Sequence, residues 1–254
     1  MSTHRDASPD SRLGSDSEKS QPAVTIVMPV YNEAMYLRET LEGWLRILRG
    51  LQVPFEFLVY DDGSTDGSNE ILDRCARDCP ELSVVHQVNR GHGPTIRRGY
   101  ESSTGEWVFQ TDSDNEIPSE EFDQLWPLRE KYDFILGRRV GRKLTFFRRL
   151  VSRWARIGVR LFYGARLRDV NSPFRLMRGE FVRSSLQSIP PGVFAPNLHL
   201  TGLAARRRLR VREVPVIWRP HRIGGAARAI SARFTTLISM FWELRSVSRR
   251  AGKG

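Results

Sequence analysis

The chain has few cysteines and no long apolar segment. Only two of its 254 residues are cysteine, Cys75 and Cys79, which are too few for a disulfide framework and wrongly spaced for a zinc site. No run approaches the roughly 18 apolar residues that span a bilayer. Residues 1–21 are rich in Ser and Asp and lack an apolar core, so we expect a disordered tail there, not a signal peptide or anchor. These absences indicate a reduced, cytosolic chain that does not cross a membrane by itself.

Acidic residues are the other shortage. Lys and Arg total 40 against 29 Asp and Glu, a net charge of +11. Such a balance favours anionic partners, among them nucleotide phosphates, nucleic acid and acidic membrane surfaces, and charge alone does not choose among them. The length fits one α/β domain. We expect that domain over residues 22–228, with a C-terminal amphipathic helix and short tail over residues 229–254.

Short apolar runs alternate with stretches at helical spacing. Strands are expected at Val24–Val30, Phe55–Tyr60, Leu82–Val88 and Trp107–Thr111, with helices between them, and later at Phe174–Met177 and Leu209–Trp218. This alternation predicts an α/β fold with a mostly parallel, doubly wound sheet flanked by helices. Ligands of such sheets lie beyond the carboxyl ends of the strands. We therefore expect the polar residues that follow these strands to share a site: Tyr31, Asp61, Asp62, Asp112 and Asp114.

The segment Asp112-Ser113-Asp114 places two carboxylates two residues apart just past a strand. Hard oxygen ligands of this kind select Mg²⁺ or Mn²⁺, which usually also hold substrate phosphates. Glu116 offers a third ligand. Because acidic loops are common, this spacing is weak evidence by itself.

Several motifs together resemble the large inverting glycosyltransferase family with the GT-A fold. Pro29-Val30-Tyr31-Asn32-Glu33, Asp61-Asp62-Gly63-Ser64-Thr65-Asp66 and Asp112-Ser113-Asp114 follow successive strands in the family's order. The likeness continues through Asn89-Arg90-Gly91-His92-Gly93, Gly137-Arg138-Arg139, Asp169-Val170-Asn171-Ser172-Pro173-Phe174-Arg175 and Glu213-Val214-Pro215-Val216. It covers roughly residues 22–230. Among relatives, the pattern is most similar to the polyprenyl-phosphate hexose transferases, the branch that includes dolichyl-phosphate mannose synthase.

This resemblance implies roles for individual residues. The nucleotide-sugar donor would contact Pro29, Tyr31, Glu33, Asp61, Asp62 and Ser113. Asp112, Asp114 and Glu116 would hold the metal, although the branch often has Gln at the last of these positions. Asp112, Asp114 and Arg139 are the expected catalytic residues, because the metal and nearby cations offset the charge that builds on the departing nucleoside diphosphate.

The kind of acceptor is predicted from a missing carboxylate in one short segment of the sequence. Hydroxyl-transferring relatives usually carry a carboxylate near the start of the helix that precedes the Glu-Val-Pro-Val strand, whereas this chain reads Ala195-Pro196-Asn197-Leu198-His199. A hydroxyl acceptor needs a base, and only His199 could serve here. A phosphate acceptor is already anionic and needs cations instead. The arginines expected to hold it are Arg138, Arg149, Arg153 and Arg222. The loop after Arg222 lacks the Ser of the family's Gly-x-Ser-Lys-like pattern, which leaves its contacts with phosphate open.

A basic amphipathic stretch lies between Arg138 and Arg168. Leu150, Trp154, Ile157 and Leu161 recur at helical spacing, and Arg149, Arg153, Arg156 and Arg160 form a parallel stripe about 100° round the helix. Such a helix suits a membrane surface. The alternative is a core helix with a solvated basic face, and core packing is the favoured interpretation for Trp154 and for Trp242, which lies on a second amphipathic stretch.

The leading hypothesis is a metal-dependent transferase that moves a hexose from a nucleotide-sugar to a polyprenyl phosphate. It would act peripherally at the cytoplasmic, inner face of the membrane, and a separate integral membrane protein is a further candidate partner. One alternative is transfer to a sugar or lipid hydroxyl. Another is a non-catalytic binder of anionic lipid or nucleic acid. We expect no nucleic-acid partner, because the sequence contains no recognised nucleic-acid motif.

Overall fold

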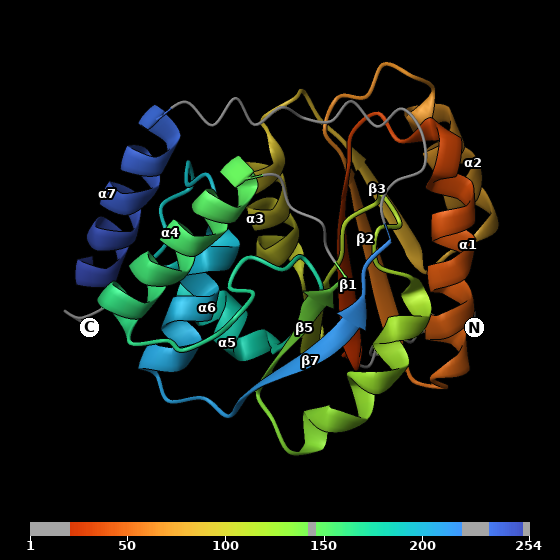
Figure 1. The fold of residues 1–254 in the computed structure, drawn as a ribbon. Helices are drawn as coiled ribbons and strands as arrows, with labels where there is room; N and C mark the ends of the chain where they lie inside the picture. The colour runs from red at the N-terminus through yellow and green to blue at the C-terminus, as the bar shows by residue number, and fades with distance from the viewer. Residues whose placement is uncertain (1–20, 142–145, 220–233, 251–254) are drawn as a thin grey trace, which may run out of the picture.

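The computed structural model describes residues 21–141, 146–219 and 234–250. Residues 1–20 of the predicted tail, the predicted boundary at residue 228, and Arg222 with the loop that follows it lie outside these ranges. Within them, seven strands form one sheet in the order β3-β2-β1-β4-β6-β5-β7 (Figure 1). The strands are β1 (Val24–Val30), β2 (Phe55–Asp61), β3 (Leu82–His86), β4 (Trp107–Gln110), β5 (Phe134–Val140), β6 (Arg175–Arg178) and β7 (Val211–Ile217).

Most neighbouring strands pair in parallel, as the alternating pattern predicts. β1 pairs in parallel with β2 and β4, β2 with β3, and β5 with β7. β6 pairs antiparallel with both β4 and β5. Because β6 reverses direction, the carboxyl ends of β4 and β5 still lie at the same edge of the sheet. The predicted α/β class is therefore confirmed.

Helices cover both faces of the sheet (Figure 1). One face carries α1 (Ala34–Gly50), α2 (Ser68–Asp78) and the short 3₁₀ helices η1 (Ser119–Gln124) and η2 (Trp126–Glu130). The other carries α3 (His92–Ser102), α4 (Phe146–Tyr163), α5 (Gly179–Leu186), α6 (Pro196–Arg206) and α7 (Phe234–Arg250). Apolar side chains of successive strand residues alternate between two buried clusters, one under each layer. No helix of the described ranges is long and apolar enough to cross a membrane.

Aromatic rings fill the core beside the fourth strand. Phe109 of β4 meets Trp44 of α1, Phe122 of η1 and Phe174 before β6, with ring centroids 5.2, 4.7 and 4.8 Å away. All four rings are 0–1% exposed. Such pairs add about 0.5–1.5 kcal/mol each beyond the burial of their area. The loop that leaves β4, which contains Asp112 and Asp114, therefore starts from a rigid base.

Candidate active site

The carboxyl edge of the sheet gathers acidic side chains around one small cavity. The cavity measures about 10 Å³ and is lined by Thr111, Asp112, Asp114, Glu116, Ile117, Arg139 and Pro173. That volume holds roughly one water-sized species. The structure thus brings both aspartates of the predicted metal pair, the predicted third ligand and the predicted catalytic arginine to one point. Ser113 lies between the aspartates and is 5% exposed.

The carboxylates around this cavity repel one another. Burial raises the pKa of Asp114 well above its ordinary value, and the negative charges of Asp112, Glu116 and Glu33 shift it in the same direction. Asn115 adopts a left-handed conformation with φ of 53°, and the N–H of Glu116 donates to Asp114 Oδ1 at 3.0 Å. The loop therefore turns sharply and crowds carboxylates that repel one another.

The acidic cluster fits a divalent cation that also binds a ligand. Among the residues that the structure describes, no three His, Cys, Asp or Glu side chains are grouped to hold a metal by themselves. Glu116 Oε2 accepts a hydrogen bond from Trp218 Nε1 at 2.7 Å. Mg²⁺ is commonly held by one or two carboxylates together with substrate phosphates. Asp112 and Asp114 provide such a pair.

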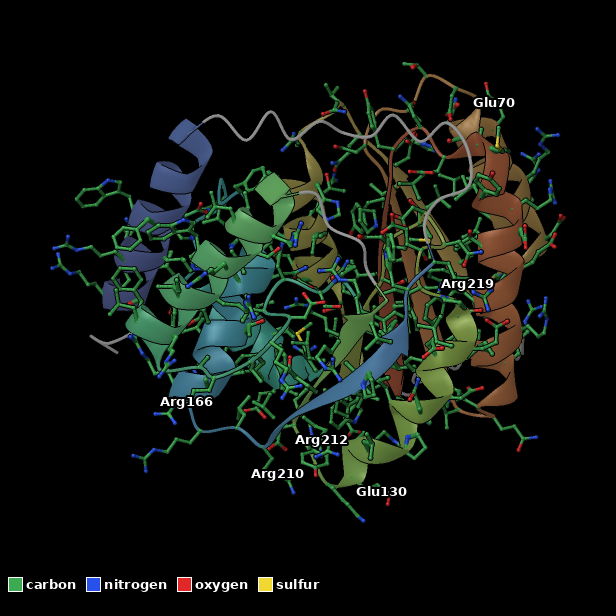
Figure 2. The ribbon with its side chains drawn as sticks, viewed as in Figure 1. Glu70, Glu130, Arg166, Arg210, Arg212 and Arg219 are labelled. Atoms are coloured by element: carbon green, nitrogen blue, oxygen red, sulfur yellow. The ribbon has the colours of Figure 1, made fainter. Side chains whose placement is uncertain are left out.

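The last strand reaches back to this loop. β7 begins just after Arg210 and ends just before Arg219. Figure 2 shows these two arginines at opposite ends of the strand. The N–H of Arg219 donates to the carbonyl oxygen of Glu116 at 2.7 Å, next to the indole bond from Trp218. The segment after β7 therefore fixes the position of Glu116.

Arg139 reaches the cavity but is held by Asp169, an acid for which the sequence predicts no role. Its Nε and Nη2 donate to Asp169 Oδ2 and Oδ1 at 2.8 and 2.9 Å. Glu213 Oε1 in turn accepts the N–H groups of Arg168 and Asp169 at 2.8 and 3.0 Å. Burial alone disfavours the charge, but Asp169 and then Asp112 and Glu116 raise the pKa of Arg139 overall. The guanidinium is fixed in place and remains charged.

The expected donor residues lie at the ends of β1 and β2. Pro29 is buried within β1, while Tyr31 and Glu33 follow it half-buried. The aspartate at the end of β2, Asp61, is 3% exposed, and its Oδ2 lies 2.8 Å from His86 Nδ1. Asp62, 4% exposed, accepts the N–H groups of Arg90 and Gly91 at 2.8 and 2.9 Å, as well as Gln87 Nε2 at 2.8 Å.

Asp66, at the end of the same acidic motif, has a different position. Its Oδ2 accepts the N–H of Ala34 at the start of α1, and its Oδ1 accepts the N–H of Ser68 at the start of α2. Burial opposes its charge, but the bonds from Ser68 and Ala34 outweigh that effect and lower the pKa of Asp66. Asp66 therefore joins two helix starts.

The structure places the predicted acceptor arginines that it describes on β5 and α4. Arg138 and Arg139 lie within β5, whereas the sequence pattern predicts them after a strand. Successive strand residues point to opposite faces. Arg139 faces the acidic cavity, so Arg138 faces the layer of α3–α7. Arg149 and Arg153 are exposed on α4.

The side of α4 that faces the core is not the predicted apolar stripe. Ala155, Gly158 and Val159 are buried, while Trp154, Ile157 and Leu161 are 47, 43 and 66% exposed. Trp242 on α7 is also 58% exposed. Core packing, the favoured interpretation for both tryptophans, is wrong. Small residues face the neighbouring helices instead, because they allow close approach.

His199, the only candidate base in its window, is part of the interior. It is 1% exposed, its Nδ1 lies 3.0 Å from the Tyr163 hydroxyl, and its Nε2 lies 3.7 Å from Glu243 Oε1. These partners belong to α4 and α7. His199 is thus packed between helices, which does not favour the hydroxyl-acceptor alternative.

This architecture, with paired carboxylates at the carboxyl edge of a mostly parallel sheet, is that of the GT-A sugar transferases. The model of the family named Glycosyl transferase family 2 matches residues 25–186. The chain belongs to this family.

Curated relatives agree with that assignment. Undecaprenyl-phosphate 4-deoxy-4-formamido-L-arabinose transferase of Pectobacterium atrosepticum is 29% identical over 224 residues, 87% of this chain and 66% of the relative. The transferase of the same name from Pseudomonas syringae pv. syringae is 33% identical over 178 residues, 69% of this chain and 53% of the relative. The chain thus spans less than two thirds of the length of these relatives.

Two solved structures share the fold at low identity. Glucosyl-3-phosphoglycerate synthase from Mycobacterium tuberculosis superposes with a TM-score of 0.63 at 18% identity, covering 91% of this chain and 80% of that one. A mannosyltransferase from Pyrobaculum calidifontis, in complex with GDP-mannose and Mn²⁺, gives 0.59 at 18% identity, covering 92% and 74%. At this identity the likeness establishes the fold alone.

Proposed function

We propose that this glycosyltransferase moves a hexose from a nucleotide-sugar to a polyprenyl phosphate. The single observation that carries the proposal is the small cavity where Asp112, Asp114 and Arg139 meet. The curated relatives are named for transfer to undecaprenyl phosphate, which supports the acceptor. The sugar in their name is a modified arabinose, so they do not support a hexose in particular.

In the proposed reaction, Asp112 and Asp114 would hold Mg²⁺ or Mn²⁺ together with the donor's diphosphate, and Glu116 is the proposed third contact. The metal, when bound, supplies positive charge that stabilises the departing nucleoside diphosphate. Structures of glucosyl-3-phosphoglycerate synthase and of the Pyrobaculum mannosyltransferase contain Mn²⁺, which supports this choice of ion. Tyr31, Glu33, Asp61 and Asp62, with Pro29 and Ser113, border the nucleotide in this proposal.

Arg139 and the acceptor arginines have separate tasks. Arg139 lies in the cavity wall, where its fixed charge would stabilise the leaving diphosphate. The acceptor phosphate would be held by Arg138, Arg149, Arg153 and Arg222, and it would attack the opposite face of the sugar with inversion. Because a phosphate oxygen is already ionised at neutral pH, the absence of an acid from the sequence Ala195-Pro196-Asn197-Leu198-His199 is consistent with this acceptor.

Binding of a nucleoside diphosphate separates this enzyme from a non-catalytic binder of anionic lipid or nucleic acid. UDP and GDP are each added with Mn²⁺ while the thermal unfolding midpoint is followed, since a ligand bound to the folded state raises it. We expect a metal-dependent rise that Asp114→Asn abolishes and that Asp78→Asn, an exposed control at the end of α2, preserves. A rise that survives Asp114→Asn would exclude the proposed role of the carboxylate pair.

The nature of the product separates phosphate from hydroxyl acceptors. A glycosyl phosphate is cleaved by mild acid, whereas a glycoside formed on a sugar or lipid hydroxyl is stable. We expect an acid-labile product. A stable product would support the alternative acceptor.

The enzyme is further proposed to act at the cytoplasmic, inner face of the membrane. The support is the surface we call the α4 face: exposed Trp154, Ile157 and Leu161 beside exposed Arg149, Arg153, Arg156 and Arg160. Aromatic and aliphatic side chains enter the interface of a bilayer while arginines attract its anionic headgroups. A separate integral membrane partner stays a prediction, as does the absence of a nucleic-acid partner.

A further inference from the structure

A buried chain of hydrogen bonds leads from the interior to Asp112. The Tyr100 hydroxyl donates to Asn197 Oδ1 at 2.8 Å, Asn197 Nδ2 donates to Gln110 Oε1 at 3.0 Å, and Gln110 Nε2 donates to Asp112 Oδ1 at 3.1 Å. Tyr100 and Gln110 are 0% exposed and Asn197 is 4% exposed. The three residues come from α3, α6 and β4, so the chain joins distant segments beneath the acidic cavity.

The direction of every bond in this chain is set by its last member. An ionised carboxylate only accepts, so Gln110 must turn its amide nitrogen toward Asp112. Its oxygen then faces Asn197, which must present its own amide nitrogen. The oxygen of Asn197 is left for Tyr100, and burial raises the pKa of Tyr100, which keeps that hydroxyl protonated as a donor. Each amide therefore has one orientation.

The backbone around Asn197 is held equally firmly. Arg175, 0% exposed, donates from Nη1 to the carbonyl oxygen of Asn197 at 2.9 Å and from Nε to the carbonyl oxygen of Ser172 at 2.9 Å. Thr201 Oγ1 also donates to the carbonyl oxygen of Asn197 at 2.8 Å. The start of α6 is thus held in place, and the hydrogen bonds of the Asn197 side chain extend from this fixed backbone.

We propose that Asn197, acting through Gln110, is a positioning residue that fixes the orientation of the Asp112 carboxylate for its metal. This inference rests on the proposed function, because it assumes that Asp112 is a metal ligand. Groups that orient metal ligands commonly affect metal affinity by 10–100-fold when they are replaced. Asn197 would then have a function of its own, in addition to lying in the segment where hydroxyl-transferring relatives usually carry a carboxylate.

Replacing this amide by a carboxylate reverses one link. In Asn197→Asp, both side-chain oxygens accept, so Gln110 has an acceptor on each side and its own oxygen must face one of them. The amide nitrogen of Gln110 can then face only one of the two carboxylates, so either Asp112 or the new carboxylate lacks a donor. A negative charge acting only through space would instead attract a cation. The two explanations predict opposite signs for the change in metal affinity.

The test is a titration of the full chain with Mn²⁺ alone, in which electron paramagnetic resonance measures the free ion. We expect Asn197→Asp to weaken Mn²⁺ binding about tenfold or more. Asn69→Asp on α2 makes the same charge change away from the hydrogen-bonded series of Tyr100, Asn197, Gln110 and Asp112, which we call the relay. This variant should bind Mn²⁺ like the parent. Circular dichroism melting verifies that each variant folds.

A double-mutant cycle tests the route. Gln110→Leu removes the link and should itself weaken Mn²⁺ binding, and in that background Asn197→Asp should cause no further loss. Binding as tight as the parent's in either single variant, or equal losses from Asn197→Asp in both backgrounds, would overturn the relay. If Asn197→Asp does not fold, Gln110→Leu alone decides.

The outcome for Asp112→Asn distinguishes the two levels of inference. If that variant loses Mn²⁺ binding while Asn197→Asp keeps it, only the relay is wrong. If Asp112→Asn retains Mn²⁺ binding, the proposed metal site is wrong and the relay with it.

Discussion

Asp61 and Asp62 are adjacent in sequence but are held by different groups. Asp61 lies against His86, whose other ring nitrogen is 3.1 Å from Asp73 Oδ1. Asp62 instead holds the loop after β3 through two backbone N–H groups. Gly63, next to both, has φ of 76°, and a Cβ there would lie 2.9 Å from the backbone nitrogen of Asn89. This turn therefore requires glycine.

The environment of His86 predicts a pH dependence of stability. Burial opposes its charge, but hydrogen bonds and attraction from Asp61 and Asp73 outweigh burial and raise the pKa of His86 above its usual 6.5. A raised pKa in the folded state stabilises below the pKa of the unfolded state, and the effect is lost as pH rises through the folded value.

We therefore expect His86→Gln to destabilise more at pH 6 than at pH 9, by at most about 1 kcal/mol because the ring is partly exposed and screened. Urea unfolding at the two pH values measures this difference. A destabilisation of the same size at both would mean that the charge of His86 contributes nothing.

Sequence patterns located the acids of the site better than their partners. The positions of Asp112, Asp114, Asp61 and Asp62 at one edge of the sheet could be predicted, because the carboxyl ends of parallel strands meet at the same edge. The hydrogen bonds that Arg139 donates to Asp169 and the support from Glu213 could not, because these contacts span 30 and 44 residues and depend on the packed fold. The sequence indicated Asp169 and Glu213 only as members of two family motifs, one leading into β6 and one within β7.

At the scale of elements, the packing of α4 depends on small residues. Gly202 of α6 lies against the ring of Tyr163, and a Cβ at this position would overlap that ring. An aromatic ring in a packed interior has little room to move. We expect Gly202→Ala to lower the free energy of unfolding by about 1–3 kcal/mol.

Gly50→Ala is the matched control, since nothing lies within 4 Å of a Cβ at that position. It should change stability by no more than about 0.5 kcal/mol. Chemical denaturation of both variants measures the difference. Equal stability of the two would show that α6 and α4 are not closely packed.

The same packing explains why periodicity misjudged α4. Its sequence contains two apolar stripes, one of large residues around Trp154 and one of small residues around Ala155 and Val159. Size and hydrophobicity favour the first as the core face. The neighbouring helices α6 and α7 approach too closely for large side chains, so the second is buried. Only the assembled helices determine that outcome.

In the whole molecule, α4 lies on the opposite side from the layer of α1 and α2 (Figure 1). Charge reversal on one side therefore has a control on the other. We expect the double variant Arg153→Glu with Arg156→Glu to lose most binding to vesicles of anionic lipid, because each basic residue near such a surface contributes about 1 kcal/mol.

Arg46→Glu with Arg77→Glu, both exposed on α1 and α2, makes the same charge change and should retain binding. Sedimentation with vesicles of phosphatidylglycerol and phosphatidylcholine measures both. Equal losses from the two pairs would show that net charge, and not the α4 face, causes membrane binding.

In the proposed reaction, the carboxylate pair would activate a nucleotide-sugar for transfer to a polyprenyl phosphate. The most direct measurement is the release of nucleoside diphosphate from a panel of sugar donors, with Mn²⁺ or Mg²⁺ and with or without undecaprenyl phosphate. We predict that one donor releases its nucleotide only when both metal and lipid phosphate are present, and that Asp112→Asn and Asp114→Asn each abolish the release. Release from no donor, or undiminished release by these variants, would exclude this reaction.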